Sequence, residues 1–223
     1  MRDKLFIGML AVCLSLTGQF AHAKPTRVNV VDGDTIKIDS QTYRLHGIDA
    51  PEAGQKCSQA GSQKKWGCGK AAISHLEEMV LGKVIRCDNR GSDGYGRVIS
   101  VCTADGKDIN ATMVSSGYAW AYRKYSLDYV EQEDKARLNK LGVFQTQTQS
   151  PWEYRSEKWS TSSDNAPEGC PIKGNISQNG RIYHTPWSPF YSRTKINTKK
   201  GERWFCNEAE ALASGWRAPR WGR

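Results

Sequence analysis

Apolar and polar residues alternate along the first part of the chain, and this pattern predicts short β-strands. Apolar side chains stand at every second position in residues 28–30, 36–38 and 43–45, as in strands that bury one face. Asp32-Gly33 and Asp39-Ser40 supply turn residues between these stretches. Residues 84–88 and 97–103 predict a further hairpin around the glycine-rich stretch 91–96. About five short strands are therefore expected, which suits a small closed or partly open barrel.

Helical spacing replaces alternation in three later stretches. Apolar residues recur three and four positions apart over 72–80, and Gly82 would stop that helix. A shorter run at 108–116 and a charged run at 127–141 also show helical patterns. Together the patterns predict an α+β domain in which a five-stranded barrel carries three helices.

The first residues have the features of a cleaved secretory signal peptide. Arg2 and Lys4 precede an apolar run over 5–16, and Ala21-His22-Ala23 provides a small-residue cleavage site. The run is too short to span a bilayer, and no later segment approaches the roughly 20 apolar residues that a transmembrane helix needs. We therefore expect residues 1–23 to be a signal peptide and the mature protein to be periplasmic or extracellular.

Composition agrees with export and indicates the kind of partner. The formal net charge is +9 at pH 7, which favours polyanionic partners such as nucleic acid. Six of the seven cysteines follow the signal peptide, and this even number predicts three disulfides in an oxidising compartment. Nearest-neighbour pairing is preferred, although six cysteines allow other connectivities. The cysteines concerned are Cys57, Cys68, Cys87, Cys102, Cys170 and Cys206.

Three short motifs bring acidic and basic residues together within one stretch of sequence. They are Val31-Asp32-Gly33-Asp34-Thr35, Arg44-Leu45-His46-Gly47-Ile48-Asp49-Ala50-Pro51-Glu52 and Tyr95-Gly96-Arg97. Hydrolysis of a phosphodiester needs a bound cation, a phosphate clamp and a group that accepts a proton from water. Carboxylates and guanidinium groups supply these parts, so the combination predicts metal-assisted phosphodiester cleavage. Few histidines and the lack of a Cys-x-x-Cys motif disfavour a zinc site or a histidine-based nuclease.

Each motif taken alone has an ordinary structural explanation. Asp32-Gly33-Asp34 is common turn chemistry, and Glu52 could be an exposed loop glutamate. Arg44 or Arg97 could form an ion pair with a local carboxylate such as Asp93. The combination and order of the motifs weaken these explanations.

Residues 26–155 resemble the thermonuclease family, whose type member is staphylococcal nuclease. The resemblance rests on the three motifs above and on the closing Leu141-Gly142-Val143-Phe144. It implies that the barrel is an OB-fold and that the cofactor is Ca²⁺, a hard cation that prefers oxygen ligands.

The resemblance also implies a set of calcium-binding residues. Asp34, Asp49 and the backbone carbonyl of Ala50 would bind the ion directly, and Asp32 and Thr35 would support it through contacts and water. The strand that carries Arg44 would return the chain to the first turn and so bring the two aspartates together. Members such as the type enzyme have Thr where this chain has Ala50, so the carbonyl is kept and a hydroxyl is lost.

Catalytic and substrate-binding roles follow from the same resemblance. Arg44 and Arg97 would contact the reacting phosphate, and Glu52 would be the general base for the attacking water. Tyr95 would lie near the phosphate or nucleotide. An aromatic run either stacks bases or packs in the core; it consists of Tyr118, Trp120, Tyr122 and Tyr125.

The composition changes after Arg155. Residues 156–169 are rich in small polar residues and predict an exposed linker. Residues 170–223 form a small, basic, tryptophan-containing module. A module of this size needs a stabilising cross-link, which a Cys170–Cys206 disulfide would provide. This module resembles one found in exported bacterial nuclease-like proteins. Polyanion binding, envelope attachment and a purely stabilising role remain open for it.

The sequence therefore predicts a secreted, calcium-dependent endonuclease. We expect it to cleave DNA with little sequence preference and to leave 3′-phosphate ends, as family chemistry implies. RNA is left open as a second substrate. The alternative is a nonenzymatic protein that binds nucleic acid or an envelope polyanion on a nuclease-like barrel. Carboxylates would repel a polyanion unless a cation intervened, so the acidic cluster favours the enzyme. No obligate protein partner is inferred.

Overall fold

The computed structural model describes residues 25–219. The expected signal peptide, residues 1–23, lies outside this range. Within it, no helix combines the length and apolar character needed to cross a membrane.

The main sheet is built from the strands that alternation predicted. β1 (Val28–Asp32), β2 (Thr35–Ile38) and β3 (Gln41–Leu45) form an antiparallel meander, and β3 pairs in parallel with β8 (Val98–Ala104). β8 also pairs with β7 (Ile85–Ser92) and with the short β9 (Lys107–Asp108). Shorter pairs join β4 (Ile48–Asp49) to β10 (Trp120–Ala121) and β5 (Cys57–Ser58) to β6 (Lys65–Trp66).

These pairings do not confirm the expected five-stranded barrel, closed or partly open. The strand order β1-β2-β3-β8-β7 is an open path, and within residues 25–219 no ladder joins β1 to β7. β1 packs instead against helix α1 (Cys68–Val80). The domain is therefore a mixed α+β structure with an open sheet.

The three predicted helices are present, and α1 and α2 (Ile109–Ser115) cover the main core. α1 buries its apolar face, and α2 begins at Asp108, whose side chain accepts a hydrogen bond from the N–H of Ala111. α3 (Val130–Leu138) follows. A 3-10 helix, Gly142–Gln145, then closes this part of the chain. The core includes Ile36, Leu45, Ile48, Leu76 and Met113.

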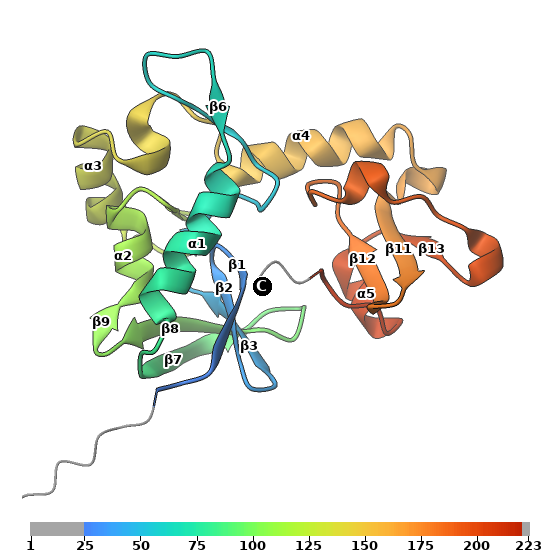
Figure 1. Cartoon of the computed structure of the whole chain (residues 1–223), viewed down its shortest axis with the longest axis horizontal. Helices are drawn as coiled ribbons and strands as arrows, with labels where there is room; N and C mark the ends of the chain where they lie inside the picture. The colour runs from blue at the N-terminus through green and yellow to red at the C-terminus, as the bar shows by residue number, and fades with distance from the viewer. Residues whose placement is uncertain (1–24, 220–223) are drawn as a thin grey trace, which may run out of the picture.

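The expected linker at 156–169 is largely helical, which corrects that prediction. α4 (Pro151–Ser163) starts at Ser150 with a capping box, in which Ser150 and Glu153 satisfy each other's backbone N–H groups, and Pro151 fills the first helical position. These start signals outweigh the polar composition that suggested a linker. Figure 1 shows α4 running from the main α+β part toward the C-terminal strands.

The C-terminal part has its own small core. β11 (Ile172–Ser177) lies between β12 (Gly180–His184) and β13 (Arg203–Phe205), and α5 (Glu208–Ala213) packs nearby. Short 3-10 helices occur at Pro167–Gly169, Tyr191–Arg193 and Thr198–Lys200. The core consists of Ile172, Tyr183, Phe205, Ala211 and Trp216.

Nearest-neighbour pairing of the cysteines is confirmed. Disulfides join Cys57 to Cys68, Cys87 to Cys102 and Cys170 to Cys206. Cys87 and Cys102 are direct partners across β7 and β8, as the predicted hairpin requires.

Candidate active site

The turn between β1 and β2 places one carboxylate against the chain after β4. A β-carbon at Gly33 would lie 2.8 Å from the Cβ of Ala50, so glycine permits this close approach. The N–H of Ala50 then donates to Asp34 Oδ2 at 2.9 Å. The Thr35 hydroxyl donates to Asp34 Oδ1 at 3.1 Å, and Asp32 accepts from the N–H of Gly33 at 2.8 Å. The first motif thus forms a turn whose central carboxylate faces Ala50.

Arg44 joins two carboxylates that are distant in sequence from each other. It lies opposite Thr35 in the register of β2 and β3. Its guanidinium forms an ion pair with Asp34 and donates to Asp49 Oδ1 at 3.0 Å. Burial lowers the pKa of Arg44, and the nearby Asp49 carboxylate opposes that shift. Asp34 is 7% exposed and Asp49 is 0% exposed, so the charges face one another with little water between them.

A second arginine, Arg155, reaches the same carboxylates from α4. Its Nη1 donates to Glu52 Oε1 at 2.6 Å and to Asp49 Oδ1 at 3.1 Å, and its Nη2 donates to Asp49 Oδ2 at 2.8 Å. Burial alone would lower the pKa of Arg155, but the contacts with Asp49 and Glu52 raise it overall. The sequence interpretation missed this residue.

Two carboxyl groups in the site have raised pKa values. Burial raises the pKa of Glu52 to about 7, although Arg155 opposes the shift. Burial, followed by repulsion from Glu52, raises the pKa of Asp32 to about 8. A carboxylate with a pKa near neutrality is well matched to accepting a proton from water at neutral pH.

The remaining predicted residues, Arg97 and Tyr95, stand on the turn between β7 and β8. Arg97 Nε donates to Asp93 Oδ2 at 2.7 Å, and its guanidinium lies 5.3 Å from the centre of the Tyr95 ring. The local ion pair anticipated as an alternative for Arg97 is therefore present. Both residues nevertheless line the same cleft as Arg44 and Glu52.

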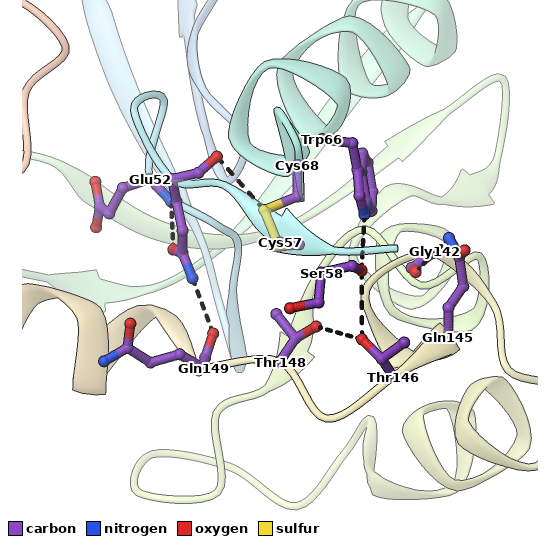
Figure 2. Close-up of a disulfide and its surroundings, with 11 residues drawn as sticks. Glu52, Cys57, Ser58, Trp66, Cys68, Gly142, Gln145, Thr146, Thr148 and Gln149 are labelled. Carbon is purple, nitrogen blue, oxygen red and sulfur yellow. Dashed lines mark hydrogen bonds between the residues drawn. A yellow bond between two sulfur atoms is a disulfide. The ribbon is translucent and has the colours of Figure 1, made fainter. Parts of the chain in front are cut away.

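Gln55 ties the Glu52 loop to the segment that precedes α4. Gln55 is 1% exposed; its side-chain oxygen accepts from the N–H of Glu52 at 3.2 Å, and its amide nitrogen donates to the carbonyl of Gln149 at 2.8 Å. Figure 2 shows the dashed lines that link Glu52 to Gln149, beside the Cys57–Cys68 disulfide. The buried Gln55 side chain therefore holds the start of α4, which carries Arg155, close to the loop that carries Glu52.

Asp32, Asp34 and Glu52 open into a cleft of about 910 Å³ that both parts of the chain line. One wall comes from the turn after β1, from β3, from the loop that follows it and from the β7–β8 turn. The other wall comes from the C-terminal part and includes Tyr183, Trp187, Ser188 and Arg217. A β-carbon at Gly54 would lie 2.9 Å from the carbonyl of Trp187, so the loop carrying Glu52 packs directly on this wall. No sequence pattern predicted this contribution.

The aromatic run divides between the interior of the domain and the cleft. Tyr118 stacks on His75 with ring centroids 4.3 Å apart, and Trp120 is buried beside Phe144. Tyr122 and Tyr125 instead line the cleft.

The residues present fit a hard cation. Asp34, Asp49 and the Ala50 carbonyl offer only oxygen atoms, the donors that calcium prefers. The two carboxylates are buried, adjacent and already matched by positive guanidinium groups. Within residues 25–219, no group of three or more His, Cys, Asp or Glu side chains is arranged to hold a metal. A cation here would therefore depend on two carboxylates, a carbonyl and water.

Comparison with known proteins agrees with the chemistry of this cleft. The model for "Staphylococcal nuclease homologue" matches residues 42–146, and the model for "ArfC" matches residues 151–218. An "Uncharacterized endonuclease" of Escherichia coli is 34% identical over 139 residues, which cover 59% of this chain and 84% of that protein. The "Micrococcal nuclease" of Shigella flexneri is 33% identical over 157 residues, covering 62% and 81%. The "Succinoglycan biosynthesis protein ExoI" of Rhizobium meliloti (strain 1021) is 33% identical over 147 residues, covering 63% and 76%.

Fold, cleft and relatives together define a nuclease that hydrolyses phosphodiester bonds. The chain belongs to the family of staphylococcal nuclease homologues. Nucleic acid is therefore its substrate class.

Proposed function

We propose that this nuclease is an exported, calcium-dependent endonuclease that cleaves DNA with little sequence preference and leaves 3′-phosphate ends, with RNA as a second candidate substrate. One observation carries the proposal: Asp34, Arg44 and Glu52 come from three segments and line one cleft, and the buried Asp49 contacts Arg44 beside them. Binding alone does not require carboxylates next to arginines, whereas hydrolysis uses both.

Glu52 is the proposed general base. Its carboxylate is 12% exposed, and burial raises its pKa to about 7, so it can take a proton from a water molecule at neutral pH. Pro51 limits the backbone before it, and Gln55 holds its N–H, so the carboxylate is directed by a constrained loop.

Asp34, Asp49 and the Ala50 carbonyl would hold the calcium ion, with Asp32 and Thr35 in support. When bound, calcium supplies positive charge that neutralises the phosphate and favours attack by water. The supporting contacts fit this assignment because the Thr35 hydroxyl and the Ala50 N–H both donate to Asp34 and orient it.

Arg44 and Arg97 are proposed to bind the reacting phosphate, and Arg97 also to stabilise the departing oxygen. A guanidinium presents a planar fork of donors that matches phosphate oxygens. Arg97 holds Asp93 through Nε, and its terminal nitrogens are the donors proposed for the phosphate. Tyr95, 43% exposed beside Arg97, is proposed to contact the nucleotide.

The proposed organisation places an OB-fold nuclease domain at 26–155 and a C-terminal module at 170–223. Residues 1–23 are proposed as the signal peptide and the periplasm or medium as the destination. Three disulfides support export, because such bonds persist in oxidising compartments.

Removal of calcium is expected to abolish cleavage. Plasmid DNA and a single-stranded RNA are incubated with the protein in calcium, in a calcium-selective chelator and in chelator followed by excess calcium. We expect fragments in the first and third samples only, because the carboxylates alone repel the phosphate. The fragments should prime a polymerase only after phosphatase treatment, as 3′-phosphate ends require. Full activity in chelator, or ends that prime directly, would contradict the proposal.

A further inference from the structure

Arg155 contacts the two carboxylates on which the proposed reaction depends. It is 24% exposed as a side chain and forms hydrogen bonds with both oxygens of Asp49 and with Glu52. It lies beyond residues 42–146, which match the nuclease family model, and within 151–218, which match the second model. A positive group from the second matched segment therefore sits in the nuclease cleft.

Asp49 has little remaining capacity to bind anything else. A carboxylate can accept about four hydrogen bonds, and Asp49 accepts two from Arg155 and one from Arg44. Its side chain is 0% exposed. A cation that bound Asp49 directly would approach the oxygens that Arg155 holds, and the two positive charges would repel each other at that distance.

A purely structural ion pair is the plain alternative. In that case Arg155 would anchor α4, and its loss would weaken the fold without a specific effect on cation binding. However, α4 already has a capping box at Ser150, and Gln55 already links Gln149 to the Glu52 loop. The helix start is thus fixed by contacts that do not involve Arg155.

We propose that Arg155 is an internal counterion that occupies the divalent cation's place on Asp49 and at the same time holds Glu52. The guanidinium balances the buried carboxylates in the ion-free enzyme and withdraws from them when calcium binds. Arg155 is in this sense a positioning residue: it keeps Asp49 and Glu52 close together before the ion arrives. The inference rests on the proposed calcium dependence.

The competition predicts a rise in calcium affinity when Arg155 is replaced. Calcium binding is measured by titration calorimetry on the full protein and on its Arg155→Gln, Arg155→Lys and Arg90→Gln variants. Arg90 lines the same cleft and controls for the loss of one positive charge without contact with the carboxylates. We expect Arg155→Gln to bind calcium about tenfold more tightly or better, and Arg90→Gln to stay within about twofold of wild type. Arg155→Lys, which keeps the charge but loses the fork, should lie between wild type and Arg155→Gln.

Thermal unfolding of the same variants gives an independent readout. In chelator, Arg155→Gln should unfold at a lower temperature than wild type, because its carboxylates lack a counterion. Saturating calcium should raise its unfolding temperature more than it raises that of wild type.

The outcomes separate the two proposals. If wild type bound calcium and both Arg155 variants bound it no more tightly than wild type, the counterion role would be overturned. The proposed calcium dependence would remain intact. If none of the four proteins bound calcium, the proposed calcium dependence would fail and the counterion role with it. Binding by Arg155→Gln but not by wild type would support the competition in its strongest form.

Discussion

Replacement of Glu52 by Gln is expected to lower kcat by about 10²- to 10⁴-fold, the usual contribution of a positioned general base. Glutamine has nearly the same shape but cannot take a proton from water. The substitution should leave the fold intact, because burial already raises the pKa of Glu52 to about 7 and a neutral side chain is tolerated in that place. The rate is measured at saturating calcium on plasmid DNA, together with the unfolding temperature.

Glu78→Gln is the matched control for this experiment. Glu78 is exposed on α1, away from the cleft, and the same chemical change there should leave kcat within about twofold of wild type. Wild-type turnover by Glu52→Gln would remove Glu52 as the base and would require another group in the cleft to take the proton.

Replacement of Arg44 by Lys is expected to reduce the rate by about 10²- to 10³-fold, comparable to the loss of a donor that stabilises a developing charge. Lysine keeps the positive charge but presents a single point of contact, whereas Arg44 spans Asp34 and Asp49 and has further donors for a phosphate. Single-turnover cleavage at saturating calcium measures the effect on the chemical step.

Arg86→Lys provides the comparison, since Arg86 is exposed on β7 and does not line the cleft. We expect it to cleave at the wild-type rate. Near-normal turnover by Arg44→Lys would contradict the phosphate-binding role and leave Arg44 as a structural link between two buried carboxylates.

Local patterns predicted the parts of the fold that depend on neighbouring residues. Alternation placed β1, β2 and β3, because each strand buries one face against the same core. The same reasoning placed the β7–β8 hairpin and therefore the Cys87–Cys102 disulfide across it. The return of β3 to the first turn predicts that Asp34 and Asp49 come together, and in the structure both carboxylates contact Arg44.

Contacts between distant segments escaped prediction. Arg155 lies 106 residues from Asp49 in the chain and 103 from Glu52. A periodic pattern of apolar residues does not indicate a contact between residues so far apart in sequence. A local signal for its helix did exist, since Ser150-Pro151-Trp152-Glu153 has the form of a capping box. The polar composition after Arg155 points instead to a linker, so composition conflicts with that local signal and does not predict α4.

The C-terminal wall of the cleft was missed for a different reason. Trp187 and Arg217 stand on irregular segments whose sequence carries no pattern for a partner surface. Their position depends on α4 and on the packing of Gly54 against Trp187. Arg97 shows a similar limit: the family resemblance implies a contact with the phosphate, but the sequence equally allows the ion pair with Asp93 that the structure contains.

The central claim is that Asp34 belongs to the ion-binding site that drives cleavage, and a calcium response curve tests it most directly. Plasmid cleavage rates are measured against calcium concentration for wild type, Asp34→Asn and Asp39→Asn. Asp39 lies in a turn at φ +52° that asparagine readily adopts, and it is exposed away from the cleft. The account predicts that Asp34→Asn needs about tenfold more calcium or is inactive, while Asp39→Asn follows wild type. Superimposable curves for Asp34→Asn and wild type would contradict it.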